Sequence, residues 1–229
     1  MLGAREPARR QRREPHHGGP RDGRVGPGGT AADAGHHLTR VTAGDLLTRV
    51  RGLLRRGPRF GPYADDEHPE RLAVLSRVIP GRVLEVGCGH RKTSPDFIGV
   101  DLVPGGELGR IGNVRGQRSM ADIAADGDRL PLRDAAVDCL VARHNLEHYV
   151  DLVGVLDEWR RVVRPGGRLV AVVPDEIRYP GSTLALDPTH YHAFSESSLG
   201  RLLPRTGWEV DEVGPCIEGW SLLVVGRSA

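Results

Sequence analysis

Val83-Leu84-Glu85-Val86-Gly87-Cys88-Gly89, followed by Ile98-Gly99-Val100-Asp101-Leu102, decides the fold of this 229-residue chain. The first stretch is typical of a buried strand that ends in a glycine turn, and the second of a buried strand that ends in a carboxylate. Glycine lets a ligand approach the backbone because it has no Cβ. A carboxylate at the tip of the next strand can accept hydrogen bonds from both hydroxyls of a ribose. The two stretches therefore predict a site for an adenosine-type cofactor.

The spacing of the glycines separates two kinds of cofactor site. A nicotinamide dinucleotide site needs a third glycine, in the pattern Gly-x-Gly-x-x-Gly. Lys92 stands at that third position and counts against a dinucleotide. The stretch from Glu85 to Gly89 instead resembles motif I of the class I S-adenosylmethionine-dependent methyltransferases, Glu/Asp-x-Gly-x-Gly.

Four further segments resemble this family, and they occur in the family's order. Residues 126–131 resemble its adenine-binding segment, and residues 137–141 resemble its fourth strand. Residues 145–148 resemble the Leu-Glu-His stretch that follows that strand, and residues 158–167 resemble the end of the helix and the turn before strand five. The chain is therefore identified as similar to class I methyltransferases with a type 11-like domain. That resemblance implies S-adenosyl-L-methionine as the cofactor.

The pattern of apolar residues predicts an α/β domain. Apolar strands alternate with helices, which is typical of a three-layer sandwich around a mostly parallel sheet. We expect helices at 43–56, 69–78, 152–163 and 195–203, and strands at 82–86, 97–102, 121–125, 136–142, 168–173, 208–213 and 221–225. The resemblance implies a Rossmann-like sheet of seven strands in the order 3-2-1-4-5-7-6, with one antiparallel strand.

Two connections depart from the usual pattern. Only residues 87–96 separate the first two strands, which is about the minimum length for a crossover that includes a helix. We therefore expect the first helix to be cut to about one turn. The glycine-rich segment 103–120 is expected to loop over one end of the site.

The chain divides into three parts by composition. Residues 1–40 carry eight arginines and four prolines and almost no large apolar residues, so we expect a disordered tail. Such a tail either binds nucleic acid through its arginines or is merely solvated, or it lies upstream of the true start of the protein. Residues 41–80 are predicted to form helices that cover the site, and residues 81–229 the cofactor-binding domain.

The sequence favours a cytoplasmic protein without a membrane partner. No apolar region follows the basic N-terminus as in a secretory signal, and no apolar run reaches the roughly 20 residues of a membrane span. Cys88, Cys139 and Cys216 are odd in number and lack Cys-x-x-Cys spacing. They are expected to be free thiols in a reducing compartment.

The family resemblance implies roles for the residues of motif I and the second strand. Gly87 and Gly89 let the methionine and ribose parts of the cofactor approach the backbone. Asp101 binds the ribose diol. Glu85 orders the glycine turn and reaches the methionine ammonium group directly or through water, or it is a structural acid beneath the loop.

It also implies roles for residues after the third and fourth strands. Asp126 accepts from the adenine amino group, although Asp128 is an alternative, and the amide of Gly127 faces the ring. His144 follows strand four, where backbone carbonyls usually hold the methionine ammonium group.

Histidines near two strand ends are the candidates for catalysis. His148 follows the fourth strand, and His190 lies in the segment Asp187-Pro188-Thr189-His190-Tyr191-His192. Imidazole and carboxyl groups that converge from two loops can form a general base, a divalent-metal site or a structural contact. We name His148 and His190 as the leading base candidates, with His192 second, and name no residue as a metal ligand.

The acceptor is expected to be a small molecule such as a natural product, a sugar or a quinone, with O-methylation favoured. No second substrate domain is visible, and the covering segments are short. The alternatives are an RNA or protein methyltransferase that uses the basic tail, and a cofactor-binding module without catalysis. An Asn-Pro-Pro-Tyr motif is absent, which disfavours methylation of nucleic-acid bases. The oligomeric state is left open.

Overall fold

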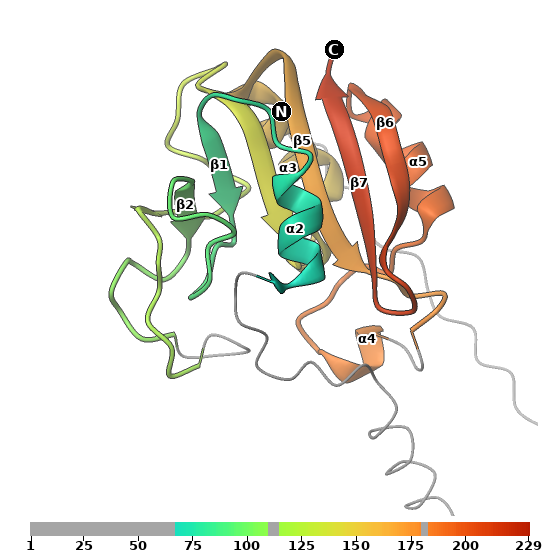
Figure 1. Cartoon of the computed structure of the whole chain (residues 1–229), viewed down its shortest axis with the longest axis horizontal. Coiled ribbons are helices and arrows are strands. Elements are labelled where there is room, and N and C mark those ends of the chain that lie inside the picture. Colours follow the sequence, from blue (N-terminus) through green and yellow to red (C-terminus); the bar gives the residue numbers. More distant parts are fainter. Residues whose placement is uncertain (1–66, 110–114, 180–182) are drawn as a thin grey trace, which may run out of the picture. The chain divides into compact units, whose positions relative to one another are not determined.

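The computed structural model of the protein describes residues 67–109, 115–179 and 183–229. Within them, seven strands form one sheet in the order β3-β2-β1-β4-β5-β7-β6 (Figure 1). β7 is antiparallel to both of its neighbours and the other pairs are parallel, which confirms the predicted fold class. The strands are β1 (Val83–Val86), β2 (Ile98–Asp101), β3 (Ile123–Ala124), β4 (Val137–Arg143), β5 (Val163–Pro174), β6 (Trp208–Ile217) and β7 (Ser221–Ser228).

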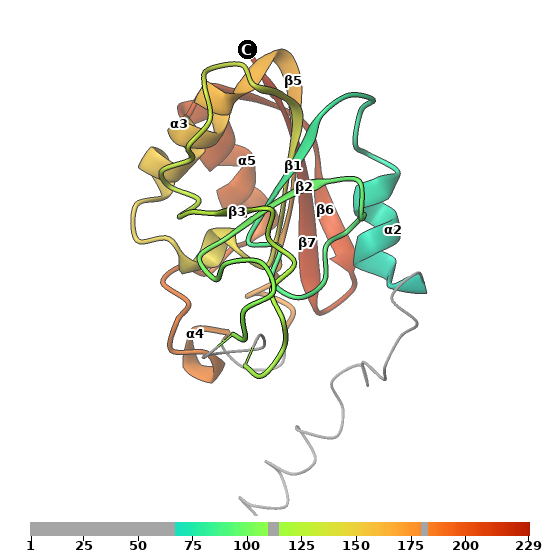
Figure 2. The ribbon, with the colours of Figure 1, turned by 90° about the vertical axis from the view of Figure 1, so that its left-hand side faces the viewer.

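Helices cover the two faces of the sheet. α2 (Pro69–Leu75) lies on one face, and α3 (Leu152–Val162) and α5 (Glu196–Arg205) lie on the other (Figure 2). Two shorter elements, η3 (Leu146–His148) and α4 (Thr183–Leu186), follow β4 and β5. None of the helices in the described ranges has the length and apolar character of a membrane span.

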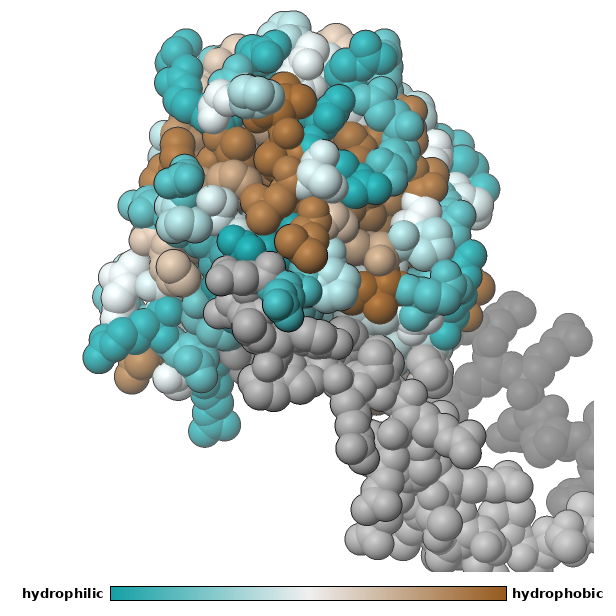
Figure 3. All heavy atoms as spheres, in the orientation of Figure 1, coloured by the Kyte–Doolittle hydropathy of each residue, from teal (hydrophilic) through white to brown (hydrophobic). Residues whose placement is uncertain are grey.

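Two apolar clusters form the core, one on each face of the sheet. The larger lies on the face of α3 and α5 and contains the buried rings of Trp159 and Trp208. The smaller lies on the face of α2 and contains Val74 and Phe97. Apolar side chains also reach the surface on the α2 side, where Leu72 is 50% exposed (Figure 3). The predicted helix at 43–56 falls outside the described residues.

The predicted start of strand five is wrong. β5 begins at Val163, directly after α3, and Val163 already pairs with Val137 of β4. The next pair is Cys139 with Arg168, so residues 164–167 bulge out of the ladder. Gly166 has a φ of +71°, a conformation that glycine adopts without strain. The Pro-Gly-Gly stretch is therefore a bulge within the strand.

The connection between β1 and β2 contains turns and bends but no helix, so even the expected single helical turn is absent. Side-chain anchors hold it instead. The ammonium group of Lys92 donates to the carbonyl of Phe97 at 3.0 Å and to Asp122 at 2.8 Å. Ser195 caps α5 in a reciprocal capping box with Ser198.

Two buried indoles offer a matched test of the core. Nε1 of Trp159 donates to the carbonyl of Gly127 at 3.0 Å, and Nε1 of Trp208 donates to the carbonyl of Leu156 at 3.2 Å. Trp159→Phe and Trp208→Phe each remove an indole N–H that donates to a buried backbone carbonyl. We therefore expect each to lower the free energy of unfolding by at least about 1–3 kcal/mol, as measured by urea denaturation. A loss below about 0.5 kcal/mol in either variant would show that this hydrogen bond contributes nothing.

Candidate active site

A cavity of about 420 Å³ opens at the carboxyl ends of the parallel strands. It is lined by the ends of β1 and β2, by residues 125–128, by residues 145 and 148–151, and by Tyr191. Cavities of about 300–1,000 Å³ are typical of small-molecule sites. In an open α/β sheet, the carboxyl ends of the strands are where ligands bind. The cavity is therefore the candidate site.

Gly87 lines the cavity at the end of β1. Its φ is +70°, and a Cβ on it would collide with the side chain of Asn145. Glycine is thus required here for two reasons that involve the protein itself. The absence of a side chain also leaves the backbone open to a ligand.

Asp101 ends β2 and lines the same cavity. One carboxylate oxygen accepts from the backbone N–H of Gly89 at 2.9 Å, and the other accepts from that of Val103 at 3.0 Å. These two bonds fix the carboxylate at the tip of the strand. Gly89, which has a φ of +54°, is not among the lining residues and reaches the site through this bond.

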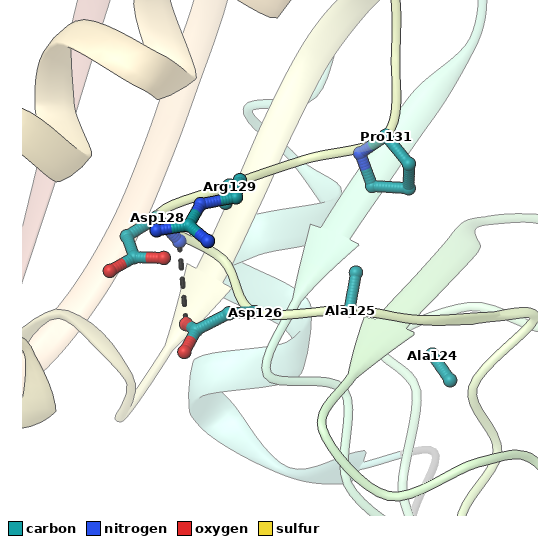
Figure 4. A pocket seen from close by; sticks show the side chains of 6 residues that line it. All are labelled: Ala124, Ala125, Asp126, Asp128, Arg129 and Pro131. Atoms are coloured by element: carbon teal, nitrogen blue, oxygen red, sulfur yellow. Dashed lines mark hydrogen bonds between the residues drawn. The ribbon is translucent and has the colours of Figure 1, made fainter.

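Asp126, Gly127 and Asp128 form the edge of the cavity beyond β3. Figure 4 shows the adjoining shallow pocket, in which the carboxylate of Asp126 accepts from the backbone N–H of Asp128 at 3.4 Å. Both acids line both pockets, so either can face a ligand. A Cβ on Gly127 would collide with the hydroxyl of Tyr149 and with Val86. Glycine is therefore required where the Tyr149 ring packs.

Glu85 lies beneath the glycine turn and is 1% exposed. Its carboxylate accepts from the N–H and the hydroxyl of Thr93, both at 2.7 Å, and from Nε of Arg143 at 3.4 Å. Burial raises the pKa of Glu85, although Arg143 and Thr93 oppose this shift. Glu85 does not line the cavity, and its observed contacts are those of an acid that orders the loop.

His144 follows β4 with a φ of +48°, which is uncommon outside glycine. Its Nε2 lies 3.0 Å from a carboxylate oxygen of Glu70, which comes from α2. Burial by itself lowers the pKa of His144, but the carboxylates of Glu70 and Glu147 outweigh it and raise that pKa to about 10. Burial by itself raises the pKa of Glu70, but His144 outweighs it and lowers that pKa to about 2. The two residues form a partly buried ion pair, in which the Glu70 side chain is 5% exposed and that of His144 is 33% exposed.

His148 and His190 lie together, as expected for segments that meet at the strand ends. Their ring centroids are 4.8 Å apart, and His148 lines the cavity. Nδ1 of His148 lies 3.0 Å from the carbonyl oxygen of Thr189. A carbonyl only accepts, so Nδ1 carries the proton in this contact and Nε2 keeps its lone pair. Burial lowers the pKa of His190, despite the opposing charge of Glu147.

Sequence reasoning missed three residues of the site. Asn145 and Tyr149 line the cavity, and the Tyr149 hydroxyl donates to Oδ1 of Asn145 at 2.9 Å. Both flank the Leu-Glu-His stretch, so their positions were visible in the sequence. Glu70 left no such signal, because it contacts a residue 74 positions later in the chain. His192 points elsewhere: its Nε2 lies 3.3 Å from the carbonyl of Val150.

The ion pair of Glu70 and His144 predicts how stability depends on pH. The pKa of His144 is raised from 6.5 to about 10, so its contribution is complete below pH 6.5 and is lost as the pH rises toward 10. The pKa of Glu70 is lowered from 4.5 to about 2, so its contribution is complete above pH 4.5 and is lost as the pH falls toward 2. The pair therefore stabilises the fold most between pH 4.5 and 6.5.

Urea denaturation at several pH values tests this dependence with His144→Asn, because asparagine tolerates a positive φ. We expect the stability difference between wild type and variant to be largest near pH 5–6 and to shrink steadily toward pH 10. Glu70→Gln should show the same trend. A difference that stays constant from pH 6 to 10 would contradict the ion pair.

Known proteins similar to this chain agree on one family. A family model described as a methyltransferase domain matches residues 44–213. A Mycolicibacterium smegmatis protein named as a probable S-adenosylmethionine-dependent methyltransferase is 32% identical over 148 residues, which are 60% of this chain and 56% of the relative. A ubiquinone biosynthesis O-methyltransferase of Xylella fastidiosa is 30% identical over 44% of this chain and 46% of the relative. The chain thus spans about half the length of these relatives.

A solved structure agrees with the fold. A Thermotoga maritima protein, described as an S-adenosylmethionine-dependent methyltransferase and possible histamine N-methyltransferase, aligns with a TM-score of 0.56 and 20% identity. The alignment covers 81% of this chain and 96% of that protein. With the family match over 44–213 and the cavity at the strand ends, the conclusion is that this chain belongs to the class I S-adenosylmethionine-dependent methyltransferases.

Proposed function

We propose that this protein transfers a methyl group from S-adenosylmethionine to a hydroxyl of a small-molecule acceptor. The observation that carries the proposal is that Gly87, Asp101 and His148 line one cavity. A cofactor cradle and a ring nitrogen with a free lone pair thus meet in a single space. When bound, S-adenosylmethionine supplies a methyl group already activated by a sulfonium.

The residues at the strand ends fit this cofactor. Gly87 presents bare backbone, and Asp101 presents a carboxylate to the ribose hydroxyls. Asp126 accepts from the adenine amino group, and Gly127 presents its amide to the ring. Three further residues act from behind the cavity wall.

Of these, Glu85 and Gly89 hold the glycine turn through their bonds to Thr93 and Asp101. The imidazole of His144 is engaged by Glu70, so the contribution of His144 to the methionine ammonium group comes from its backbone carbonyl.

His148 acts as the general base. The carbonyl of Thr189 fixes its ring with the proton on Nδ1, so Nε2 can accept the proton of a hydroxyl. His190 packs edge-on against this ring and holds it in place. Burial lowers the pKa of His190, which favours the neutral ring and avoids a second positive charge beside His148.

A small apolar acceptor fits the rim of the cavity. Leu102, Val150 and Tyr191 line it and are 69%, 73% and 57% exposed. Relatives in part of the sequence include demethylmenaquinone methyltransferases of Mycobacterium species, 44% identical over 24% of this chain and 24% of the relative. These features favour a quinone-like acceptor, methylated in a biosynthetic step.

The domain organisation and location complete the proposal. Residues 81–229 carry the cofactor site in this proposal, and residues 41–80 supply helices that cover it; the contact of Glu70 on α2 with His144 supports this arrangement. Cys88, Cys139 and Cys216 are all free thiols, which supports a cytoplasmic location.

Binding of the cofactor can be tested at Asp101. Asp101→Ala should raise the Kd for S-adenosylmethionine by about 5–150-fold, because a hydrogen bond to a charged acceptor is worth about 1–3 kcal/mol. Asp122→Ala is the matched control: Asp122 accepts from the N–H of Gly99 at 2.7 Å but does not line the cavity. Titration calorimetry that finds equal affinity in wild type and Asp101→Ala would place the ribose elsewhere.

Catalysis can be tested at His148. His148→Ala should bind S-adenosylmethionine normally but lose about 10²–10⁴ in turnover, the usual worth of a general base. The wild-type rate should rise with pH as the base loses its proton, and the variant should lack this rise. His192→Ala is the control. The assay follows labelled methyl transfer to a panel of hydroxyl-bearing quinols and sugars. Full activity in His148→Ala would exclude His148 as the general base.

A further inference from the structure

Glu147 is a buried carboxyl group without hydrogen-bond partners. Its side chain is about 1% exposed, and neither oxygen has a partner within the described part of the chain. Leaving such a group unpaired costs several kcal/mol once it is ionised. Neighbouring Nδ1 of His190 is also buried and unpartnered within those residues. A buried carboxylate whose hydrogen-bonding capacity is unused calls for an explanation, and a further ligand would supply one.

No cationic group of the described residues lies within hydrogen-bond length of the Glu147 carboxylate. Nδ1 of His144 is 3.7 Å from Oε1 of Glu147, and Nε2 of His190 is 3.9 Å from the same oxygen. The other ring nitrogen of His144 is 3.0 Å from Glu70, so His144 is already engaged. The Glu147 carboxylate is therefore available to a ligand on its far side.

The far side of Glu147 holds two imidazoles. Nε2 of His190 lies 3.9 Å from Oε1 of Glu147, and one potential ligand atom from each of Glu147, His148 and His190 lies within 4.8 Å of the others. Ligands of a tetrahedral zinc ion are about 3.4 Å apart, given metal–ligand distances of 2.0–2.1 Å. A contraction of up to about 1.4 Å would bring the three groups to that spacing.

We propose that Glu147, His148 and His190 bind a divalent cation of the zinc class. Two imidazoles and one carboxylate are an established donor set for zinc and leave the fourth position open. The contact between Nδ1 of His148 and the carbonyl of Thr189 supports the site, because metal-ligating histidines usually donate their other ring N–H to a carbonyl or carboxylate. Asp187, 3.8 Å from Nε2 of His190, adds a second carboxylate beside the nitrogen that would bind the cation.

The cation and the proton compete for one lone pair. This consequence rests on the proposed function, in which Nε2 of His148 accepts the proton of the acceptor hydroxyl. A cation bound to Nε2 occupies that lone pair, so the metal-loaded protein loses its base. The site thereby makes methyl transfer sensitive to zinc.

Titration calorimetry of the full chain with Zn²⁺ tests the site. The tail contains further histidines, so the readout is the difference in stoichiometry between variants. We expect Glu147→Gln and His190→Gln each to bind one zinc ion fewer than wild type. His192→Gln is the matched control, since this histidine contacts Val150 and lies outside the cluster, and it should bind as many ions as wild type. Circular dichroism melting confirms that each variant is folded.

The outcomes separate the two proposals. Equal zinc stoichiometry in wild type and in either folded cluster variant would overturn the metal site, whatever the activity. If the stoichiometry falls by one and zinc suppresses methyl transfer in wild type and His192→Gln, both the site and the competition stand. If the stoichiometry falls but zinc stimulates transfer, the site stands and the general-base role of His148 is wrong.

Discussion

The buried carboxylate of Glu85 is the interaction on which the site depends. The segment between β1 and β2 is too short to form a helix, so its backbone cannot satisfy itself by helical hydrogen bonds. Glu85 replaces them by accepting two hydrogen bonds from Thr93 and one from Arg143 at the end of β4. The guanidinium of Arg143 in turn donates to the carbonyl of Arg91 at 2.8 Å. One acid on the central strand thus joins the loop to the neighbouring strand whose end forms the cavity wall.

The cavity and the histidine cluster are neighbours that meet at one residue. Asp101, Gly127 and Asn145 belong to the cavity, whereas Glu147 and His190 lie behind its wall. His148 belongs to both, because it lines the cavity and packs against His190. A ligand in the cavity can therefore contact the cluster directly through the imidazole of His148. This arrangement follows from η3, a single turn that places Glu147 inward and His148 toward the opening.

Much of this arrangement was predictable from the sequence, for reasons that individual residues show. Short apolar runs such as residues 83–86 and 98–101 predict strands, and glycines at 87 and 127 predict places where no Cβ fits. The sequence could not show which protein groups exclude a Cβ at these glycines. In the structure, Asn145 excludes it at Gly87 and Tyr149 excludes it at Gly127. The sequence also missed the bulge in β5, because a Pro-Gly-Gly stretch is equally compatible with a turn. The pairing of Glu70 with His144 depends on tertiary contact alone, and no local pattern records it.

That pairing has a consequence for where the folding unit begins. A chain cut at residue 81 would keep every strand of the sheet and every residue of the cavity. It would also keep His144, whose backbone has a positive φ. It would lose Glu70, whose carboxylate lies nearest to Nε2 of His144. Because α2 precedes β4 in the chain, it is synthesised first, and Glu70 can pair with His144 only after β4 has been made. The helix in front of the sheet is therefore part of the domain, and its natural boundary lies on the N-terminal side of Glu70.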